Sequence, residues 1–253
     1  MIAVRRSILF LTVFLLAFLI YVSILSSFYG SAKASLFFQS LGMVVFWFVL
    51  LAALVVSFFI FRTLRRRLGL LLIHLACVLV LAGAMWGSQT GHTLRQKYLG
   101  ETRIYEGYLV LHEGFSANSV ITIDTSASVG ELPFHLALTR FSILYHPSDQ
   151  GDSLYPQQYS SDVRFISNEG KQLDEKTITV NNPAVFGGYH FFQSSYGHSQ
   201  HGTYSVLQVK AISGLHVVYA GYILLCVGLV WSLWIRRVLP AILSYKRADA
   251  DAY

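Results

Sequence analysis

Four apolar runs constrain this chain more than any other feature, because each is long enough to cross a lipid bilayer. A hydrocarbon core of about 30 Å requires about 20 apolar residues in a helix. We therefore expect four transmembrane helices, at residues 7–27, 36–61, 70–87 and 215–235. Of all residues 54% are hydrophobic and 13% are charged, which is ordinary for a membrane protein with one modest soluble part.

The basic residues predict how these helices are oriented. The surplus behind the formal charge of +6 lies beside the apolar runs, at Arg5, Arg6, Arg62, Arg65, Arg66, Arg67, Arg236, Arg237, Lys246 and Arg247. Segment 88–213 instead carries eight Lys/Arg against eleven Asp/Glu. Because basic residues flank spans on the cytoplasmic side, both termini and the loop 62–67 are predicted to be cytoplasmic. The missing basic patch argues against a nucleic-acid partner.

The first run has an alternative interpretation as a cleaved signal peptide. Arg5 and Arg6 precede it, and Ala32-Lys33-Ala34 resembles a cleavage site. The apolar core of a signal peptide usually has about 7–15 residues, and this run is longer, so a retained helix is favoured.

Segment 88–213 is predicted to be an extracytoplasmic all-β domain between helices three and four. It alternates with period two and is interrupted by turn-forming residues. The predicted strands are Tyr108–Leu111, Ser119–Asp124, Pro133–Tyr145, Ser161–Ile166, Thr177–Val180, Tyr189–Ser194 and Tyr204–Ala211. Seven short strands suggest a sandwich or an open-barrel-like sheet. The domains are then 1–87 with three helices, 88–213, and 214–253 with the fourth helix and a cytoplasmic tail.

His74 is the best candidate for chemistry, because it lies about five residues inside the cytoplasmic end of the third helix. An ionisable residue at membrane depth is costly and indicates function. A neutral imidazole suits a metal or haem iron. A hydrogen bond to a neighbouring helix explains it equally well. His216, at the outer mouth of the fourth helix, is the other candidate cofactor-binding residue, and it is too far away to share an iron with His74.

No metal site or self-contained active site is expected. His198-Ser-Gln-His201 has H-x-x-H spacing, but a solvated Gly/Ser-rich turn explains it better than a metal site. His92, His112, His135, His146 and His190 are interpreted as strand or surface residues. The two cysteines, Cys77 and Cys226, both lie in apolar runs, so the outer segment has no disulfide, and the chain has no C-x-x-C-H haem-attachment motif.

Four stretches in the second half of the chain resemble a known family. They are LPFHLALTRFSILYHP (132–147), YSSDVRF (159–165), KTITVNNPAVFGGYHFFQSSYG (176–197) and VVYAGYILLCVGLVW (217–231). In this order they resemble the ResB family, also called CcsB, of cytochrome c biogenesis by the System II route. The outer domain is short for that family, and FSILYHP and HFFQSSYG depart from its usual wording.

The resemblance implies a non-catalytic membrane subunit of a holocytochrome c synthase in the bacterial cytoplasmic membrane. Such a subunit works with a ResC/CcsA-like partner to move haem b outward and attach it to apocytochrome c. A histidine in the family's third helix is thought to ligate that haem together with one from the partner, and His74 occupies the matching place. The alternative is a scaffold that holds the partner or the apocytochrome without binding haem. A b-type electron-transfer subunit is less favoured, because it needs paired intramembrane histidines.

Overall fold

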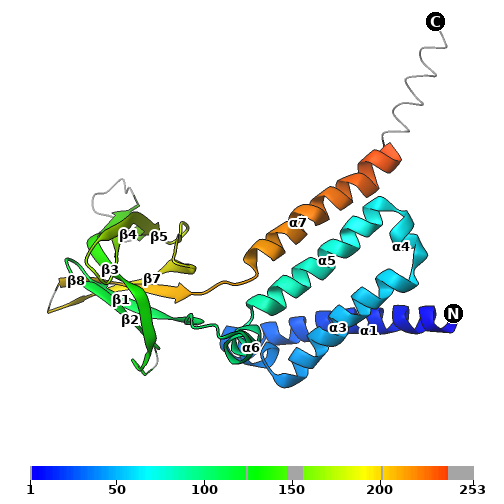
Figure 1. Ribbon diagram of the computed structural model, residues 1–253, viewed down its shortest axis with the longest axis horizontal. Helices are drawn as coiled ribbons and strands as arrows, with labels where there is room; N and C mark the ends of the chain where they lie inside the picture. The colour runs from blue at the N-terminus through cyan, green and yellow to red at the C-terminus, as the bar shows by residue number, and fades with distance from the viewer. Residues whose placement is uncertain (1, 124, 147–155, 201, 239–253) are drawn as a thin grey trace, which may run out of the picture. The chain divides into compact units, whose positions relative to one another are not determined.

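The structure is a computed structural model that describes residues 2–123, 125–146, 156–200 and 202–238. These residues divide into two compact units (Figure 1). The helical unit comprises the described residues of 1–100 and 213–253, and the β domain those of 101–212. Of the residues singled out in the sequence, Asp124, Pro147, His201, Lys246 and Arg247 lie outside the described ranges.

The helical unit contains four helices that are long and apolar enough to cross a membrane, at residues 3–27, 41–60, 68–87 and 215–235. This confirms the four apolar spans expected from the sequence. The elements of the unit are α1 (Ile2–Ser27), α2 (Ser31–Phe38), α3 (Leu41–Ile60), α4 (Arg62–Arg66), α5 (Leu68–Gly87), α6 (Gln89–Leu99), α7 (Leu215–Val230) and its π-helical continuation η1 (Trp231–Val238).

Two helical boundaries differ from the sequence-based expectation, and helix caps explain both. The run 36–61 is interrupted between α2 and α3, where the Ser40 side chain accepts a hydrogen bond from Met43 N at 3.4 Å. Helix α6 lies in a segment expected to be β. The Ser88 hydroxyl caps its start, and Gly100, with φ +68°, ends it in the left-handed conformation.

Helices α5 and α7 pack side by side along their length through small residues (Figure 1). The buried small residues recur every seven positions, at Gly69, Ala76 and Gly83 on α5 and at Gly221 and Gly228 on α7. A Cβ added at Gly221 would lie 3.0 Å from Val80 N and 3.2 Å from Ala76 O. Small side chains at such positions let two membrane helices approach backbone to backbone.

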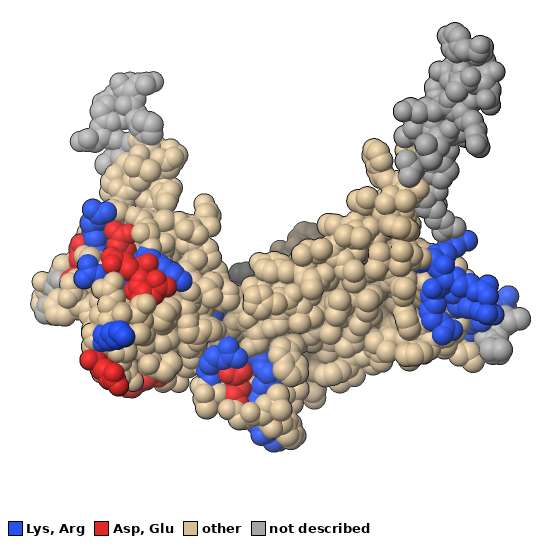
Figure 2. Space-filling view, turned by 45° about the horizontal axis from the view of Figure 1, so that its top comes forward, with Lys and Arg blue, Asp and Glu red and all other residues tan. Residues whose placement is uncertain are grey.

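The other long helices pack in the order in which they occur along the chain: α1 packs on α3, and α3 packs on α5. The α1–α3 contact is built from Leu15, Met43, Phe46 and Leu50. Lys and Arg side chains gather at the end of the helical unit that carries α4 (Figure 2). This distribution matches the loop 62–67 from which the orientation was predicted.

The described part of the β domain forms one antiparallel sheet of eight strands in the order β5-β4-β3-β2-β1-β8-β7-β6. The strands are β1 (Glu106–His112), β2 (Ser116–Ile121), β3 (Ser128–Tyr145), β4 (Pro156–Ile166), β5 (Gln172–Thr179), β6 (Ala184–Phe186), β7 (Tyr189–Ser199) and β8 (Gly202–Lys210). The short strand β6 lies between two of the predicted strands, in a segment for which no strand was predicted.

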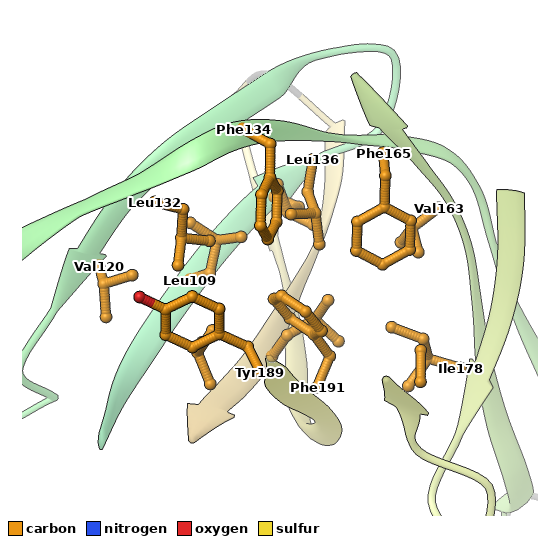
Figure 3. Packing of buried hydrophobic residues seen from close by; sticks show 14 of the residues in the cluster. Leu109, Val120, Leu132, Phe134, Leu136, Val163, Phe165, Ile178, Tyr189 and Phe191 are labelled. Atoms are coloured by element: carbon orange, nitrogen blue, oxygen red, sulfur yellow. The ribbon is translucent and has the colours of Figure 1, made fainter. Parts of the chain in front are cut away.

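The sheet curls around a single core, which is the open-barrel alternative rather than the sandwich. Its edge strand β5 contacts β6 and β7 from the other edge, and Lys176 Nζ on β5 donates to Val185 O on β6 at 2.7 Å. Inward-facing side chains of opposite strands meet in the middle, among them Phe134, Phe165 and Phe191 (Figure 3). Strand β1 alternates between buried and half-buried residues, as the period-two pattern predicts.

The first and last strands of the domain are neighbours. β1 pairs with β8 from Glu106 opposite Lys210 onwards, and Ala211 N donates to Tyr105 O at 3.0 Å. The two chain segments that lead to α6 and α7 therefore leave the domain side by side.

Candidate functional site

His74 lies on the side of α5 that faces away from α7. The small-residue positions, such as Ala76, face α7, and at 100° per residue His74 points in roughly the opposite direction. There it meets α3, where His74 Nε2 donates to the backbone carbonyl of Leu54 at 2.7 Å. The glycine contact between α5 and α7 thus sets the rotation of α5 that presents the imidazole to α3.

The imidazole also lines a cavity of about 300 Å³ among α1, α3, α4 and α5. The lining residues are Leu9, Thr12, Val13, Ser57, Phe61, Thr63, Leu64 and His74. Thr12 and Ser57 donate their hydroxyl hydrogens to carbonyls of their own helices, Ile8 O and Ala53 O. His74 therefore supplies the one ionisable, metal-ligating side chain among these lining residues, all of which the structure describes.

The arrangement fits an axial ligand of haem iron in its donor chemistry. Histidines that bind metals usually donate their second ring N–H to a carboxylate or a backbone carbonyl, which fixes the ring and raises its basicity. The Leu54 carbonyl is such an acceptor, and the Nδ1 lone pair is then left for a ligand. The apolar walls suit the body of a porphyrin. The same hydrogen bond also serves helix packing, as the sequence interpretation allowed.

The structure does not bring His216 to this cavity. His216 is the second residue of α7 and is exposed. Gly228 lies against Ile73, and Gly83 lies against Val218, so α5 and α7 run antiparallel in a defined register. His74 and His216 are then separated along the helix axis by about eleven residues, or ~16 Å at 1.5 Å per residue. One iron could not take both as axial ligands.

The remaining histidines gather no metal site in the described part of the chain, where no group of three or more His, Cys, Asp or Glu could hold an ion. His198 Nδ1 lies 3.1 Å from the Thr203 hydroxyl, and its motif partner His201 is not described. His92 differs from the expectation of a strand or surface residue. It is buried on α6, where its Nδ1 lies 3.5 Å from the Arg95 guanidinium.

The sequence interpretation missed a buried polar cluster in the β domain. Ser161 Oγ on β4 donates to Gln193 Oε1 on β7 at 2.7 Å and lies 2.8 Å from Ser205 Oγ on β8. Ser161 and Ser205 are fully buried, and Gln193 is 7% exposed. These hydrogen bonds satisfy polar groups inside the barrel and tie β4 to the opposite strands. Ser161 and Gln193 lie in the stretches YSSDVRF and HFFQSSYG, and the resemblance of these stretches to the family was the one sequence signal that could have pointed to the cluster.

The stretch QSSYG holds a β-bulge that directs side chains into the barrel. The pairing of β7 with β8 shifts between Gln193 and Ser195, so Ser194 and Ser195 are both exposed. The alternation then resumes with Tyr196 turned inward, its ring 5.1 Å from Phe141. Gly197 packs against the Tyr204 ring and leaves no room for a side chain. These residues therefore shape the interior of the barrel.

Comparison with known proteins gives the same family as the resemblance. The chain is similar to "Protein NrfI" of Wolinella succinogenes, with 38% identity over 102 residues, which cover 40% of this chain and 11% of that protein. It is similar to "Cytochrome c biogenesis protein CcsB" of Microcystis aeruginosa, with 31% identity over 138 residues, covering 54% and 27%. CcsB of Trichormus variabilis is 30% identical over 133 residues, covering 52% and 25%.

The chain thus spans about a quarter or less of the length of these relatives. Among solved structures it is similar to "Cytochrome c Heme Lyase CcmF", with a TM-score of 0.38 and 11% identity, over 76% of this chain and 29% of that one. The model of the ResB-like family matches residues 55–205, which are more than half of the chain. This protein is therefore a member of the ResB-like family.

Proposed function

We propose that this protein is a membrane subunit of a cytochrome c biogenesis complex, in which His74 supplies one axial ligand to haem within the membrane. The observation that carries the proposal is the position of His74, which lines an apolar cavity and is oriented by the Leu54 carbonyl. Membership of the ResB-like family and similarity to proteins named for cytochrome c biogenesis support the biological context.

The positions of the histidines imply a partner. The four apolar spans contain His74 and His216, and His216 lies at the end of its span far from the α4 end, so we infer that a second axial ligand at the depth of His74 comes from another polypeptide. We infer that a ResC/CcsA-like membrane protein supplies it, and that the chain has no catalytic residue of its own. Bound haem b would bring an iron centre that accepts imidazole nitrogen. His216 is proposed as a second candidate haem contact, at the N-terminal end of α7 and away from the His74 cavity.

The orientation and the β domain complete the proposal. We propose that the α4 end of the helical unit lies in the bacterial cytoplasm and the β domain on the outer face, and the arginines around α4 support this through the positive-inside rule. There it would support delivery of haem to apocytochrome c. The strongest alternative is a scaffold that binds no haem, and the Leu54 hydrogen bond favours it, because that bond explains His74 by packing alone.

A substitution that keeps the hydrogen bond but removes the imidazole separates the two functions. In His74→Gln the side-chain amide can still donate to Leu54 O, and a hydrogen bond between membrane helices is worth only about 0.6–1.7 kcal/mol. The variant should therefore fold. We expect the complex purified with its partner to lose its low-spin haem absorption, and His74→Gly to regain it when imidazole is added.

The matched control is Thr12→Val, which changes a lining residue contributed by α1 and leaves the imidazole in place. It should retain the haem spectrum. If His74→Gln and His74→Gly instead keep wild-type haem content and still mature a reporter c-type cytochrome, the scaffold function is correct and the ligand proposal is wrong.

A further inference from the structure

A second cavity of about 300 Å³ lies at the α4 end of the helical unit, between the start of α5 and the end of α7. It is lined by Arg66, Arg67, Leu68, Gly69, Leu70, Trp231 and Ser232. This cavity is distinct from the one that His74 lines, because none of these residues contributes to both. Its lining is polar and basic, whereas the His74 cavity is apolar.

The cavity exists because two helix ends approach closely beneath a basic loop. Gly69 has no side chain, and a Cβ at that position would lie 2.9 Å from the Cβ of Ser232. The contact brings the start of α5 and the start of η1 together, while Arg66 and Arg67 remain exposed on the rim. The neighbouring Arg65 is engaged elsewhere, since its guanidinium donates to Phe59 O at 3.3 Å.

No carboxylate among the described residues of the helical unit neutralises these arginines. Residues 1–100 contain no Asp or Glu, and neither do residues 213–248. Among the described residues, the ion pairs of the chain all lie in the β domain. A pair of guanidinium groups beside a cavity of this size is therefore suited to bind an anionic ligand.

We propose that this cavity binds the phosphate headgroup of an anionic phospholipid. The planar forks of Arg66 and Arg67 match phosphate oxygens bidentately. The Ser232 hydroxyl is a further donor, while Trp231 and Leu68 offer apolar surface to the glycerol and upper acyl chains. Basic pockets between membrane helices on the cytoplasmic side are suited to anionic lipid headgroups.

The inference is independent of the haem proposal, because it uses neither His74 nor its cavity. It needs only the helical unit in a bilayer, with the α4 end at the level of the headgroups. That level follows from the spans themselves, since Arg66 and Arg67 directly precede α5, and Trp231 directly follows α7 as the first residue of η1.

Native mass spectrometry of the full chain tests the proposal with two charge-matched variants. Phosphatidylglycerol and phosphatidylcholine with the same acyl chains are titrated onto the wild type, onto Arg66→Gln/Arg67→Gln and onto Arg62→Gln/Arg65→Gln. Both variants lose two positive charges from the same loop, but only the first alters the cavity lining. All four arginines are exposed, so glutamine at these positions preserves the fold.

We expect the wild type and the Arg62/Arg65 variant to bind phosphatidylglycerol, and the Arg66/Arg67 variant to bind it at least about tenfold more weakly, because it loses the charge-assisted hydrogen bonds to the phosphate. Phosphatidylcholine should bind weakly to all three. Equal losses of phosphatidylglycerol affinity in both variants would mean that only the general charge of residues 62–67 matters, and would contradict a binding site in this cavity. Equal binding of both lipids, or displacement of phosphatidylglycerol by millimolar inorganic phosphate, would contradict the proposal that the ligand is an anionic phospholipid.

Discussion

In the helical unit α5 and α7 meet through glycine and alanine, whereas in the β domain opposite strands meet through phenylalanine and leucine. Lipid tails are as apolar as leucine, so burying a large side chain between membrane helices gains little, and close backbone approach takes its place. In water the same burial contributes about 25 cal/mol per Å². The two units therefore differ in which substitutions they tolerate.

The contrast also explains where ligand chemistry is found. The β domain satisfies its buried polar groups internally, as the cluster of Ser161, Gln193 and Ser205 does. The helical unit has few polar groups, and His74 and the arginines beside α5 each line a cavity that an outside molecule could complete. In both proposals the ligand therefore binds to the helical unit, whereas the buried polar groups of the β domain stabilise its fold.

Truncating a core aromatic residue should have the largest effect on stability. Phe191 is fully buried, with its ring centroid 5.4 Å from that of Phe165, so Phe191→Ala should lower the free energy of unfolding of the β domain by about 3–5 kcal/mol. Phe115→Ala is the control, because Phe115 is 61% exposed, and should change it by less than about 0.5 kcal/mol. Hydrogen exchange of β7 and β8 in the full chain measures both, and equal losses would contradict the assigned core.

Adding one methyl group between α5 and α7 should be the next most damaging change. In Gly221→Ala the new Cβ meets the Val80 amide nitrogen at 3.0 Å, so the helices must separate, at a cost of about 1–3 kcal/mol. Gly42→Ala on α3 is the matched control, because no atom lies within 4 Å of a Cβ there. The chain's four tryptophans, Trp47, Trp86, Trp231 and Trp234, lie in the helical unit, so their fluorescence during SDS titration reports on it alone. An equal response of both variants would contradict the packing.

Removing one hydroxyl group from the buried polar cluster should cost less. Ser161→Ala leaves the Gln193 amide and the Ser205 hydroxyl with fewer partners, and we expect a loss of about 1–2 kcal/mol, toward the lower end of the range for an unsatisfied buried group. The control is Ser142→Ala, whose hydroxyl bonds to Ser160 on the exposed face. It should change stability by under about 0.5 kcal/mol. Hydrogen exchange of β4 distinguishes them, and a smaller loss for Ser161→Ala than for the control would contradict the structural role of the cluster.

The sequence predicts the features that depend on long uniform patterns. Continuous apolar character predicts α5 within two residues of its start at Leu68, and alternation predicts β1, because each signal is repeated along the element. Helix α6 carries no such repeat. It depends on the Ser88 cap, on Gly100, and on the hydrogen bond from Arg95 to the Trp86 carbonyl, which form only once α5 has ended. Ser88 and Gly100 are nevertheless residue types that typically start and end a helix, so the sequence does contain a signal for α6.

The contacts around the candidate site are harder to predict from the sequence. The depth of His74 can be counted from the sequence, but its direction depends on the rotation of α5, which is set by glycines of α7 about 150 positions away. The same holds for Ser161, Gln193 and Ser205, which meet only after eight strands have paired and β7 has formed its bulge. Single residues identify candidates, whereas contacts between distant segments decide what they touch.

The smallest effect should come from acid, and it should separate the two units. Asp174 on β5 accepts hydrogen bonds from the Lys176 ammonium group at 3.1 Å and from Glu175 N at 2.9 Å, and these lower the pKa of its carboxyl below the ordinary 3.8. A lowered folded-state pKa means that the contribution to stability is fully present above pH ~4 and is lost as pH falls through the folded pKa.

The comparison between the units makes this small effect measurable. Residues 1–100 contain no Asp or Glu, so acid in this range protonates no carboxylate in α1–α6. We expect hydrogen exchange in β5 to accelerate on lowering the pH from 5 to 3, after correction for the intrinsic rate, while SDS midpoints followed by tryptophan fluorescence stay constant. In Asp174→Asn the acceleration in β5 should shrink, and high salt should weaken it in the wild type, because the pair is exposed and screened. An acid response in the helical unit as steep as that in β5 would contradict the assignment of the effect to carboxylates of the β domain.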